Sequence, residues 1–213
     1  MTAKPDKTAR HRVKRAPKRA GYDRDSIHDI LDAGKICHVG FCIEEQPYVI
    51  PMAYARDGDR MLLHGSSASR LMKTLGAGIE ACVTVTHLDG MVLARSTFHH
   101  SMNYRSVVAF GEARLIEDEM EKRSALDLLV EHLTPGRTAE CRAPNAIEMK
   151  ATHVLMFHMR DVSAKVRTGP PVDDDEDLAM DVWAGTIPLT TEEGEPESAP
   201  DLKPGIAIPR YLR

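Results

Sequence analysis

Short segments with the composition of β-strands follow one another closely through the first third of the chain. Residues 36–43 (ICHVGFCI), 47–55 (PYVIPMAYA) and 60–65 (RMLLHG) are separated only by the turn signals EEQ and RDGD. An Asp-Gly pair between two apolar runs is typical of a β-hairpin, because these residues accept the backbone angles of a tight turn. The pattern therefore favours neighbouring antiparallel strands over strands that alternate with helices.

The strand pattern continues through the rest of the folded part. One helix is predicted after Tyr22, with Asp25 as its N-cap and Gly34 as its end. Another is predicted over residues 117–136, whose start is acidic and whose end is Pro-Gly. Few helices beside many short strands favour a mainly β fold with peripheral helices, an α+β protein built on a small antiparallel barrel. Further strands are predicted over 79–86, 91–97, 105–116, 152–159 and 162–167.

Length and composition indicate the size of the domain and the cellular compartment that we expect. A chain of 213 residues predicts one domain of ordinary size. The sequence has no run of the ~20 apolar residues that span a bilayer, and its start lacks the apolar segment of a secretory signal. The four cysteines have no C-x-x-C spacing, which argues against zinc and disulfides. We expect a cytoplasmic protein that does not associate with membranes.

The two ends of the chain differ from its middle in composition. Residues 1–19 carry eight Lys or Arg and one Asp, although the whole chain has a net charge of −4. A basic arm can bind nucleic acid, but no aromatic residue is interleaved with these charges, so we expect a disordered arm over residues 1–21 and no nucleic-acid partner. Residues 22–189 form the predicted domain. Acidic residues, Pro and Gly then predict a poorly ordered tail over residues 190–213.

One strand ends in a segment suited to an anion. In LLHGSSASRLMK, residues 62–73, Ser66 or Ser67 is the predicted N-cap of a short helix, and Arg70 and Lys73 fall on one face of it. Free N–H groups and the helix dipole favour a phosphate at such a start. An ordinary capped helix with surface Arg and Lys explains the pattern equally well. The segment lacks the P-loop motif, so it does not indicate a nucleoside triphosphate.

A second polar cluster, HHSMNYRS over residues 99–106, precedes a nearly apolar strand. A solvated loop can hold such residues. The pair His99 and His100 can also suggest a metal, but adjacent side chains on an extended chain point opposite ways, and no third ligand has a helpful spacing. We therefore predict no metal site.

Taken in order, HVGF, PYVIPMAYARDGDRMLLHGSSASRLMK, HSMNYRSVVAFGEARL, SAKVRTGPPVDDDEDL and VWAGTIPL resemble the pyridoxamine 5′-phosphate oxidase-related, flavin-nucleotide-binding proteins. The resemblance runs from about Tyr22 to Leu189. It implies a six-stranded antiparallel split β-barrel, a homodimer, and one FMN per subunit in the cleft between the subunits.

The resemblance also implies which residues hold the flavin. The strand Val49–Met52 would lie along the flavin ring, and Ser66, Ser69 and Arg70 match the phosphate-binding turn, in which the oxidases have Ser-Arg-Lys. Leu71 stands in place of that lysine, so Lys73 is a candidate substitute. The implied cofactor-binding set is Val49, Ile50, Pro51, Met52, His64, Gly65, Ser66, Ser69, Arg70, Lys73, Tyr104, Arg105, Ser106 and Trp183.

The activity that follows is an FMN-dependent oxidoreductase acting on an unassigned small molecule. His64, His99 and His100 are candidate proton donors, and no catalytic residue is assigned. The oxidases follow their tryptophan with Arg-x-His, which is missing after Trp183, so true pyridoxamine 5′-phosphate oxidase activity is not expected. The alternatives are a nitroimidazole-reductase-like or haem-binding relative, for which His64 would matter, and a non-enzymatic flavin carrier.

Overall fold

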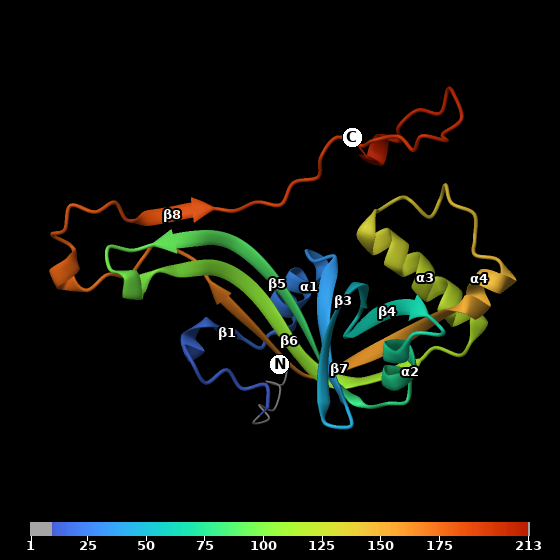
Figure 1. Ribbon diagram of the computed structural model, residues 1–213, viewed down its shortest axis with the longest axis horizontal. Helices are drawn as coiled ribbons and strands as arrows, with labels where there is room; N and C mark the ends of the chain where they lie inside the picture. The colour runs from blue at the N-terminus through green and yellow to red at the C-terminus, as the bar shows by residue number, and fades with distance from the viewer. Residues whose placement is uncertain (1–9, 213) are drawn as a thin grey trace.

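The computed structural model describes residues 10–212. Within them, one antiparallel sheet is surrounded by four α-helices and short 3-10 turns (Figure 1). The strands are β1 (Ala20–Gly21), β2 (Ile36–Ile43), β3 (Gln46–Asp57), β4 (Arg60–Ser66), β5 (Glu80–Leu93), β6 (Ser101–Leu115), β7 (Thr152–Arg167) and β8 (Gly185–Pro188). The helices are α1 (Arg24–Asp32), α2 (Arg70–Gly76), α3 (Glu119–Leu133) and α4 (Ala146–Ala151), and the 3-10 turns are η1 (Pro17–Arg19), η2 (Thr97–His99), η3 (Asp175–Asp177) and η4 (Arg210–Leu212).

Six of the strands close into a ring. The sheet runs β7-β4-β3-β2-β5-β6, and β6 pairs again with β7, while β1 pairs with β7 and β8 with β5. All of these pairings are antiparallel. The prediction of a six-stranded antiparallel barrel with peripheral helices is confirmed.

Two strands are longer than the sequence predicted. Residues 79–97 were expected to form a hairpin through HLDG, and residues 152–167 to form two strands, but β5 and β7 are each continuous. A bulge between Leu88 and Gly90 absorbs the turn residues of β5. A second bulge, at Arg160 of β7 opposite Phe110 and Gly111 of β6, lets β7 continue as one strand. Neighbouring strands on both sides keep these segments extended, which local turn chemistry cannot override.

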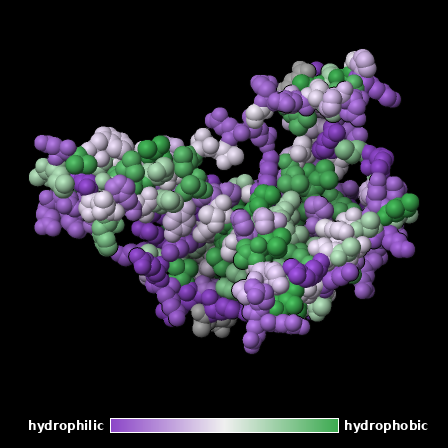
Figure 2. Space-filling view, in the orientation of Figure 1, coloured by the Kyte–Doolittle hydropathy of each residue, from purple (hydrophilic) through white to green (hydrophobic). Residues whose placement is uncertain are grey.

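The long strands carry a projection away from the barrel. The far ends of β5 and β6, with β8 alongside, extend to one side of the molecule (Figure 1). Hydrophobic side chains gather on this projection in Figure 2. The exposed apolar residues on it and on its connections include Leu88, Met91, Phe98, Met102, Val172, Leu178, Met180, Val182, Trp183 and Ile187.

The barrel splits between β3 and β4. These strands pair only from Tyr54 to Asp57 on β3, whereas Gln46–Ala53 pairs with β2 on one side alone. Beyond Leu63, β4 continues along β7. Within the described residues, the first half of β3 therefore has one unpaired edge, and it faces away from β2.

The core has two parts. The barrel interior is filled by large apolar side chains from every strand of the ring and is closed by α1 and α2. A smaller cluster under α3 covers the opposite face of β4 and β7, with Ala55, Leu62, Ala125, Leu129 and Val154 as buried members. The strands on both sides of the split contribute buried side chains to these clusters, so packing fixes the position of the split.

Two helix starts differ from the prediction. Helix α1 begins after Asp23, not Asp25, because the Asp23 carboxylate accepts a hydrogen bond from the Ser26 N–H at 2.8 Å. Helix α4 was not predicted, because its six residues give no helical periodicity. It begins with a capping box in which Asn145 and Glu148 each accept a backbone N–H of the other.

Both ends of the described chain contact the domain. The sequence predicts a disordered arm, whereas Arg10 donates to the carboxylates of Glu80 and Asp161 at 2.8 and 2.9 Å, and His11 is buried. Residues 1–9 of the predicted arm lie outside the described residues. No helix that the structure describes is both long and apolar enough to cross a membrane.

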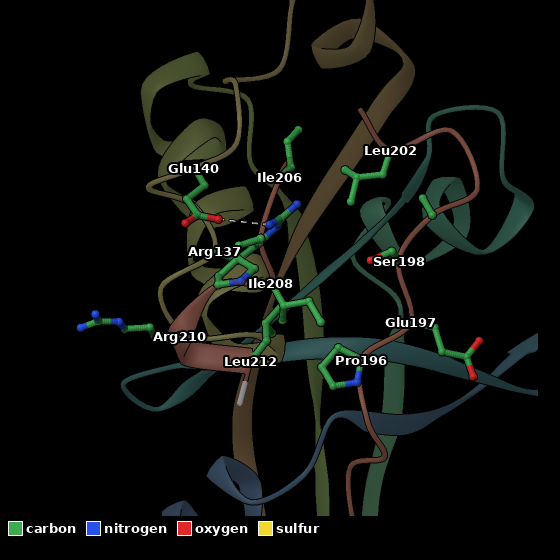
Figure 3. Close-up of a pocket in the computed structure, with 13 residues that line it drawn as sticks. Arg137, Glu140, Pro196, Glu197, Ser198, Leu202, Ile206, Ile208, Arg210 and Leu212 are labelled. Atoms are coloured by element: carbon green, nitrogen blue, oxygen red, sulfur yellow. Dashed lines mark hydrogen bonds and ion pairs between the residues drawn. The ribbon is translucent and has the colours of Figure 1, made fainter. Parts of the chain in front are cut away.

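The C-terminal segment runs back from β8 to the loop after α3 (Figure 1). The Tyr211 hydroxyl donates to Glu140 at 2.7 Å and accepts from Arg137 at 3.2 Å. A cavity of about 730 Å³ lies between residues 196–212 and this loop, as Figure 3 shows. The segment that was predicted to be poorly ordered is thus docked on the loop.

Candidate functional site

The unpaired edge of β3 offers backbone groups to a ligand. Val49, Ile50 and Pro51 pair with Gly40, Val39 and His38 of β2, so on their other edge the backbone polar groups have no strand of the described residues beside them. Val49 is 65% exposed and Ile50 39% exposed. A planar heterocycle with donors and acceptors along its rim matches such an edge, and Val49–Met52 was the segment predicted for this role.

Arg70, the first residue of α2, places a positive charge across the split, against β3. The guanidinium of Arg70 sits over the ring of Tyr48, with 4.5 Å from its carbon to the ring centre, and Tyr48 stacks in turn on Phe41 at 5.4 Å. Arg70 is exposed and makes no ion pair or hydrogen bond with a described residue. A charge held by an aromatic face, with its donors free, is available to an incoming anion.

The serine turn before α2 has a different cap from the one predicted. Helix α2 begins at Arg70, and its N-cap is Ser69, not Ser66 or Ser67. The earlier serines form a turn instead, in which Ala68 N–H donates to the Ser66 hydroxyl oxygen at 3.2 Å and Ser69 N–H to the Ser66 carbonyl at 2.9 Å. The Ser69 side chain makes no cap hydrogen bond. Its hydroxyl and the first N–H groups of α2 therefore remain as donors beside Arg70.

The other predicted residues of this segment have separate surroundings. A Cβ on Gly65 would lie 3.0 Å from Met72, so the glycine makes room for α2 and not for a ligand. Lys73 lies one turn after Arg70 and is exposed. His64 keeps access to solvent, and the protein packed around its ring lowers the pKa of His64 by desolvation. A lowered pKa keeps the imidazole neutral, which is the form that binds metals.

The second predicted group lies on β6. Arg105 donates to both oxygens of Asp89 at 2.9 and 2.8 Å, and this hydrogen bonding lowers the pKa of Asp89. The Ser106 hydroxyl donates to the Lys165 carbonyl at 3.3 Å. Tyr104 precedes them on the strand and pairs with β7. Arg105 thus already has a carboxylate partner, unlike Arg70.

Within one chain, the two predicted groups do not meet. Ser66 pairs with Thr152 at the start of β7, and Ser106 pairs with Lys165 near its end. At roughly 3.3 Å per residue, these positions are on the order of 40 Å apart along the strand. Trp183 is 66% exposed and lies next to β8 on the projection. The structure therefore places the serine turn and β3 together, and it places Tyr104, Arg105, Ser106 and Trp183 elsewhere.

The other two histidines predicted as proton donors, His99 and His100, lie on the projection. His99 Nε2 is 3.0 Å from a carboxylate oxygen of Asp174, and His100 Nδ1 is 3.0 Å from the Ser96 carbonyl. Both lie on the connection between β5 and β6, at the ends of these strands that are far from the split. Tyr48 was not predicted as a site residue. It directly precedes the predicted segment Val49–Met52, and an aromatic residue at that position could have indicated it.

Comparisons with known proteins agree with this architecture. The flavocytochrome Anf3 from Azotobacter vinelandii is 41% identical, with a TM-score of 0.92 over 98% of this chain and 97% of that one. The FAD and heme binding protein from Mycobacterium smegmatis is 38% identical, with a TM-score of 0.88 over 91% and 95%. A proposed 5-nitroimidazole antibiotic resistance protein from Bacteroides thetaiotaomicron is 26% identical, with a TM-score of 0.58 over 69% and 86%.

A search of curated proteins gives no match. A sequence model of one family, described as pyridoxamine 5′-phosphate oxidase, matches residues 23–166. This range holds the ring of barrel strands except Arg167, the last residue of β7, and it includes the split with the serine turn and Arg70. The similar structures share the split barrel of this chain, and the chain belongs to the pyridoxamine 5′-phosphate oxidase family.

Proposed function

We propose that this chain is a redox protein that binds a flavin nucleotide at the split between β3 and β4. The observation that carries the proposal is Arg70, a cation with free donors that lies against Tyr48 beside the unpaired edge of β3. The free edge of Val49–Met52 suits the flavin ring, and Ser69, Arg70 and the first turn of α2 suit a phosphate. The donors of the split therefore match both parts of a flavin nucleotide, its ring and its phosphate.

The residues of the chain would bind and orient the cofactor. When bound, a flavin supplies hydride or single-electron transfer. The Arg70 guanidinium would leave the Tyr48 ring and donate to the phosphate, and Lys73 would add a second positive charge one turn further along α2. Packing behind β3 would hold Val49–Met52 rigid, which fixes the position of the ring. The small-molecule substrate and the catalytic residue stay unassigned.

A homodimer would complete the site. Tyr104, Arg105, Ser106 and Trp183 are distant from the serine turn within one chain, so they can reach a flavin at the split only from a second copy. The projection that carries them has many exposed apolar side chains. Burial of such a surface is the usual driving force for a stable dimer.

The form of the flavin is a separate point. The sequence resemblance implies FMN, whereas the Mycobacterium smegmatis protein, 38% identical over 91% of this chain, is named as binding FAD. Identity at that level over nearly the whole chain favours FAD as the nucleotide here, with the same phosphate turn used for either molecule.

Haem is the second cofactor that we propose. The two most extensive similarities are to a flavocytochrome and to a protein named for FAD and haem. His64 directly precedes the serine turn, keeps solvent access, and has a pKa lowered by desolvation, so its neutral imidazole would be available to bind a haem iron. A protein that holds both groups would transfer electrons between them. The proposed function is thus a flavin- and haem-dependent oxidoreductase, for which the predicted cytoplasmic location is suitable.

The absorption spectrum of the purified chain tests this proposal. We expect flavin bands, a Soret band when haem is supplied during expression, and FAD or FMN in the mass spectrum of the denatured protein. His64→Ala should lose the Soret band and keep the flavin, whereas His38→Ala, which removes another exposed histidine, should keep both. A chain that carries no flavin and binds neither FAD nor FMN on titration would overturn the proposal.

A further inference from the structure

A cluster of three side chains on the projection has the composition of a metal site. His99 of η2, Asp174 and Asp177 each direct one ligand atom to a common point, and these atoms all lie within 4.8 Å of one another. His99 Nε2 and the Asp174 carboxylate are 3.0 Å apart. The cluster joins two segments that are 75 residues apart in the chain. It lies outside the proposed flavin and haem positions.

The acidic segment of this cluster is held in place by its neighbours. Asp173 is almost wholly buried, and it accepts hydrogen bonds from the Arg95 backbone at 2.9 Å and from the Arg95 guanidinium at 2.7 Å. The Asp177 N–H then donates to the Asp174 carbonyl at 2.9 Å, which closes the η3 turn and brings both carboxylates to the side of His99. The two aspartates are therefore positioned by backbone contacts that need no metal.

From this geometry we propose that His99, Asp174 and Asp177 bind one divalent cation of the zinc type. One imidazole nitrogen with two carboxylate oxygens is a ligand set that Zn²⁺ accepts, at bonds of about 2.0–2.2 Å. Ligand atoms around such an ion lie about 3–4 Å apart, so the side chains need to close in by only ~1 Å. Three protein ligands leave a coordination position for water.

Charge on the same segment also favours a cation. Residues 173–177 are Asp-Asp-Asp-Glu-Asp, and among the described residues the ion pairs of this run are those of Asp173 with Arg95 and Asp174 with His99. Asp177 lies beside the His99–Asp174 pair and has no ion pair of its own with a described residue. A divalent ion would balance both carboxylates and lower the repulsion along the run.

The cation would act as a structural clamp. It would fasten η2, between β5 and β6, to η3, which lies on the connection from β7 to Trp183 and β8. The sequence alone argued against a metal because no third ligand followed His99 at a suitable spacing. The second and third ligands, Asp174 and Asp177, come from the acidic run after β7, which only the fold brings to His99.

Calorimetric titration of Zn²⁺ into the full-length, untagged and flavin-free chain tests the site. We expect one equivalent to bind, and His99→Ala and Asp177→Asn each to weaken it at least about 10-fold. Two matched controls should bind as wild type: His100→Ala removes the adjacent histidine, and Asp175→Asn removes an exposed carboxylate of the same turn. The melting temperature should rise with Zn²⁺ in wild type and controls, and not in the two site variants.

Zinc that binds equally well to His99→Ala and Asp177→Asn would overturn the proposal, as would the absence of binding to wild type. Exposed Cys42 and Cys141 are the other ligands that zinc could find, so the titration is repeated in a Cys42→Ser, Cys141→Ser background. Binding that disappears in that background would assign the metal to the cysteines and contradict the site. Because no flavin is present, neither result bears on the proposed flavin function.

Discussion

The guanidinium carbon of Arg70 lies 4.5 Å from the centre of the Tyr48 ring, so a cation from the start of α2 reaches across to the unpaired half of β3. An exposed contact of this kind contributes about 0.5–1 kcal/mol, whereas hydrogen bonds to a charged partner contribute about 1.5–3 kcal/mol. A phosphate at the split would therefore take Arg70 from Tyr48. The contact keeps the guanidinium close to where the anion would bind.

Replacement of Arg70 by Ala should weaken flavin nucleotide binding. Loss of a bidentate, charge-assisted contact costs roughly 2–4 kcal/mol, or about 30- to 1,000-fold in affinity. Arg70→Lys should recover only part of the loss, because a point charge does not reproduce the planar fork. Quenching of flavin fluorescence in a titration gives the dissociation constants.

Two controls separate the phosphate contact from a general loss of charge. Riboflavin, which lacks the phosphate, should bind wild type and Arg70→Ala with similar, weak affinity. Arg114→Ala removes an exposed arginine of β6 that makes no ion pair with a described residue, and it should bind FMN and FAD as wild type does. Wild-type affinity in a folded Arg70→Ala protein would show that the phosphate lies elsewhere.

The ion pair between Asp32 at the end of α1 and Arg56 of β3 should make stability depend on pH. Hydrogen bonds from Arg56, at 2.6 Å to each oxygen, lower the pKa of Asp32 from its ordinary 3.8. Because the pKa of Asp32 is lowered in the folded protein, the ion pair contributes to the free energy of unfolding above pH 3.8. This contribution is lost as the pH falls through the pKa of Asp32 in the folded protein. At neutral pH, Asp32→Asn should cost up to about 1 kcal/mol, since the pair is partly exposed.

Urea unfolding of wild type and Asp32→Asn, from about pH 7 down to about pH 2, checks this dependence. The difference between the two proteins should shrink at the acidic end. Asp29→Asn changes a carboxylate on the same helix that has no ion pair with a described residue, and it should give no pH-dependent difference. A constant difference at every pH for Asp32→Asn would refute the link to titration.

The barrel was predictable because its strands are local patterns. Within residues 36–66, short strand-like segments are separated by tight turns, and β2, β3 and β4 begin and end close to those segments. The lengths of β5 and β7 were not predictable, because they depend on pairing with strands far away in the sequence. Local signals such as HLDG favour a turn, and only the presence of β6 and β8 on either side overrides it.

The sequence suggested residues for the candidate site but not where they lie relative to one another. Arg70 and the β3 segment were identified from sequence, and the structure places them on the two sides of one split. Ser106 and Trp183 lie far from the serine turn because of the course of β7, which no local pattern encodes. The same reason hid the approach of Asp174 to His99, since the two residues lie on connections after different strands.

Gly111 should tolerate no side chain. A Cβ there would lie 1.9 Å from the carbonyl oxygen of His158, at the bulge where β6 and β7 change register. Because the obstacle is backbone, relief requires the strands to move, and we expect Gly111→Ala to lose roughly 1–3 kcal/mol of unfolding free energy. Gly76→Ala is the control, since its Cβ would lie 3.5 Å from the nearest atom and the change should stay within about 1 kcal/mol. Equal unfolding midpoints for the two variants would contradict this account.

The flavin-loaded protein should oxidise pyridoxamine 5′-phosphate slowly or not at all. The oxidases grip this substrate with an Arg-x-His after their tryptophan, whereas Trp183 is followed here by Ala-Gly and the strand β8. An oxygen-consumption assay with a true oxidase as positive control measures the rate. Turnover of about 1 per second or more, ordinary for enzymes, would mean that other residues bind the substrate.

The protein should be a homodimer in which each flavin site uses both chains. Light scattering should give close to twice the 23.6 kDa chain mass. The motive is that Ser66 and Ser106 pair with opposite ends of β7, so one chain supplies the phosphate turn but cannot supply Trp183 and the β6 residues to the same site. A monomer that binds flavin at full strength would refute the shared site.

Mixed dimers give the sharper form of this prediction. Arg70→Ala and Trp183→Ala should each weaken every site in their own homodimers. In a dimer of one chain of each kind, both changes fall in one site and the other site is intact. Random mixing by co-expression should then restore tight flavin binding to about a quarter of all sites. If each site were built within a single chain, every site in the mixture would carry one of the two changes, and tight binding would not return.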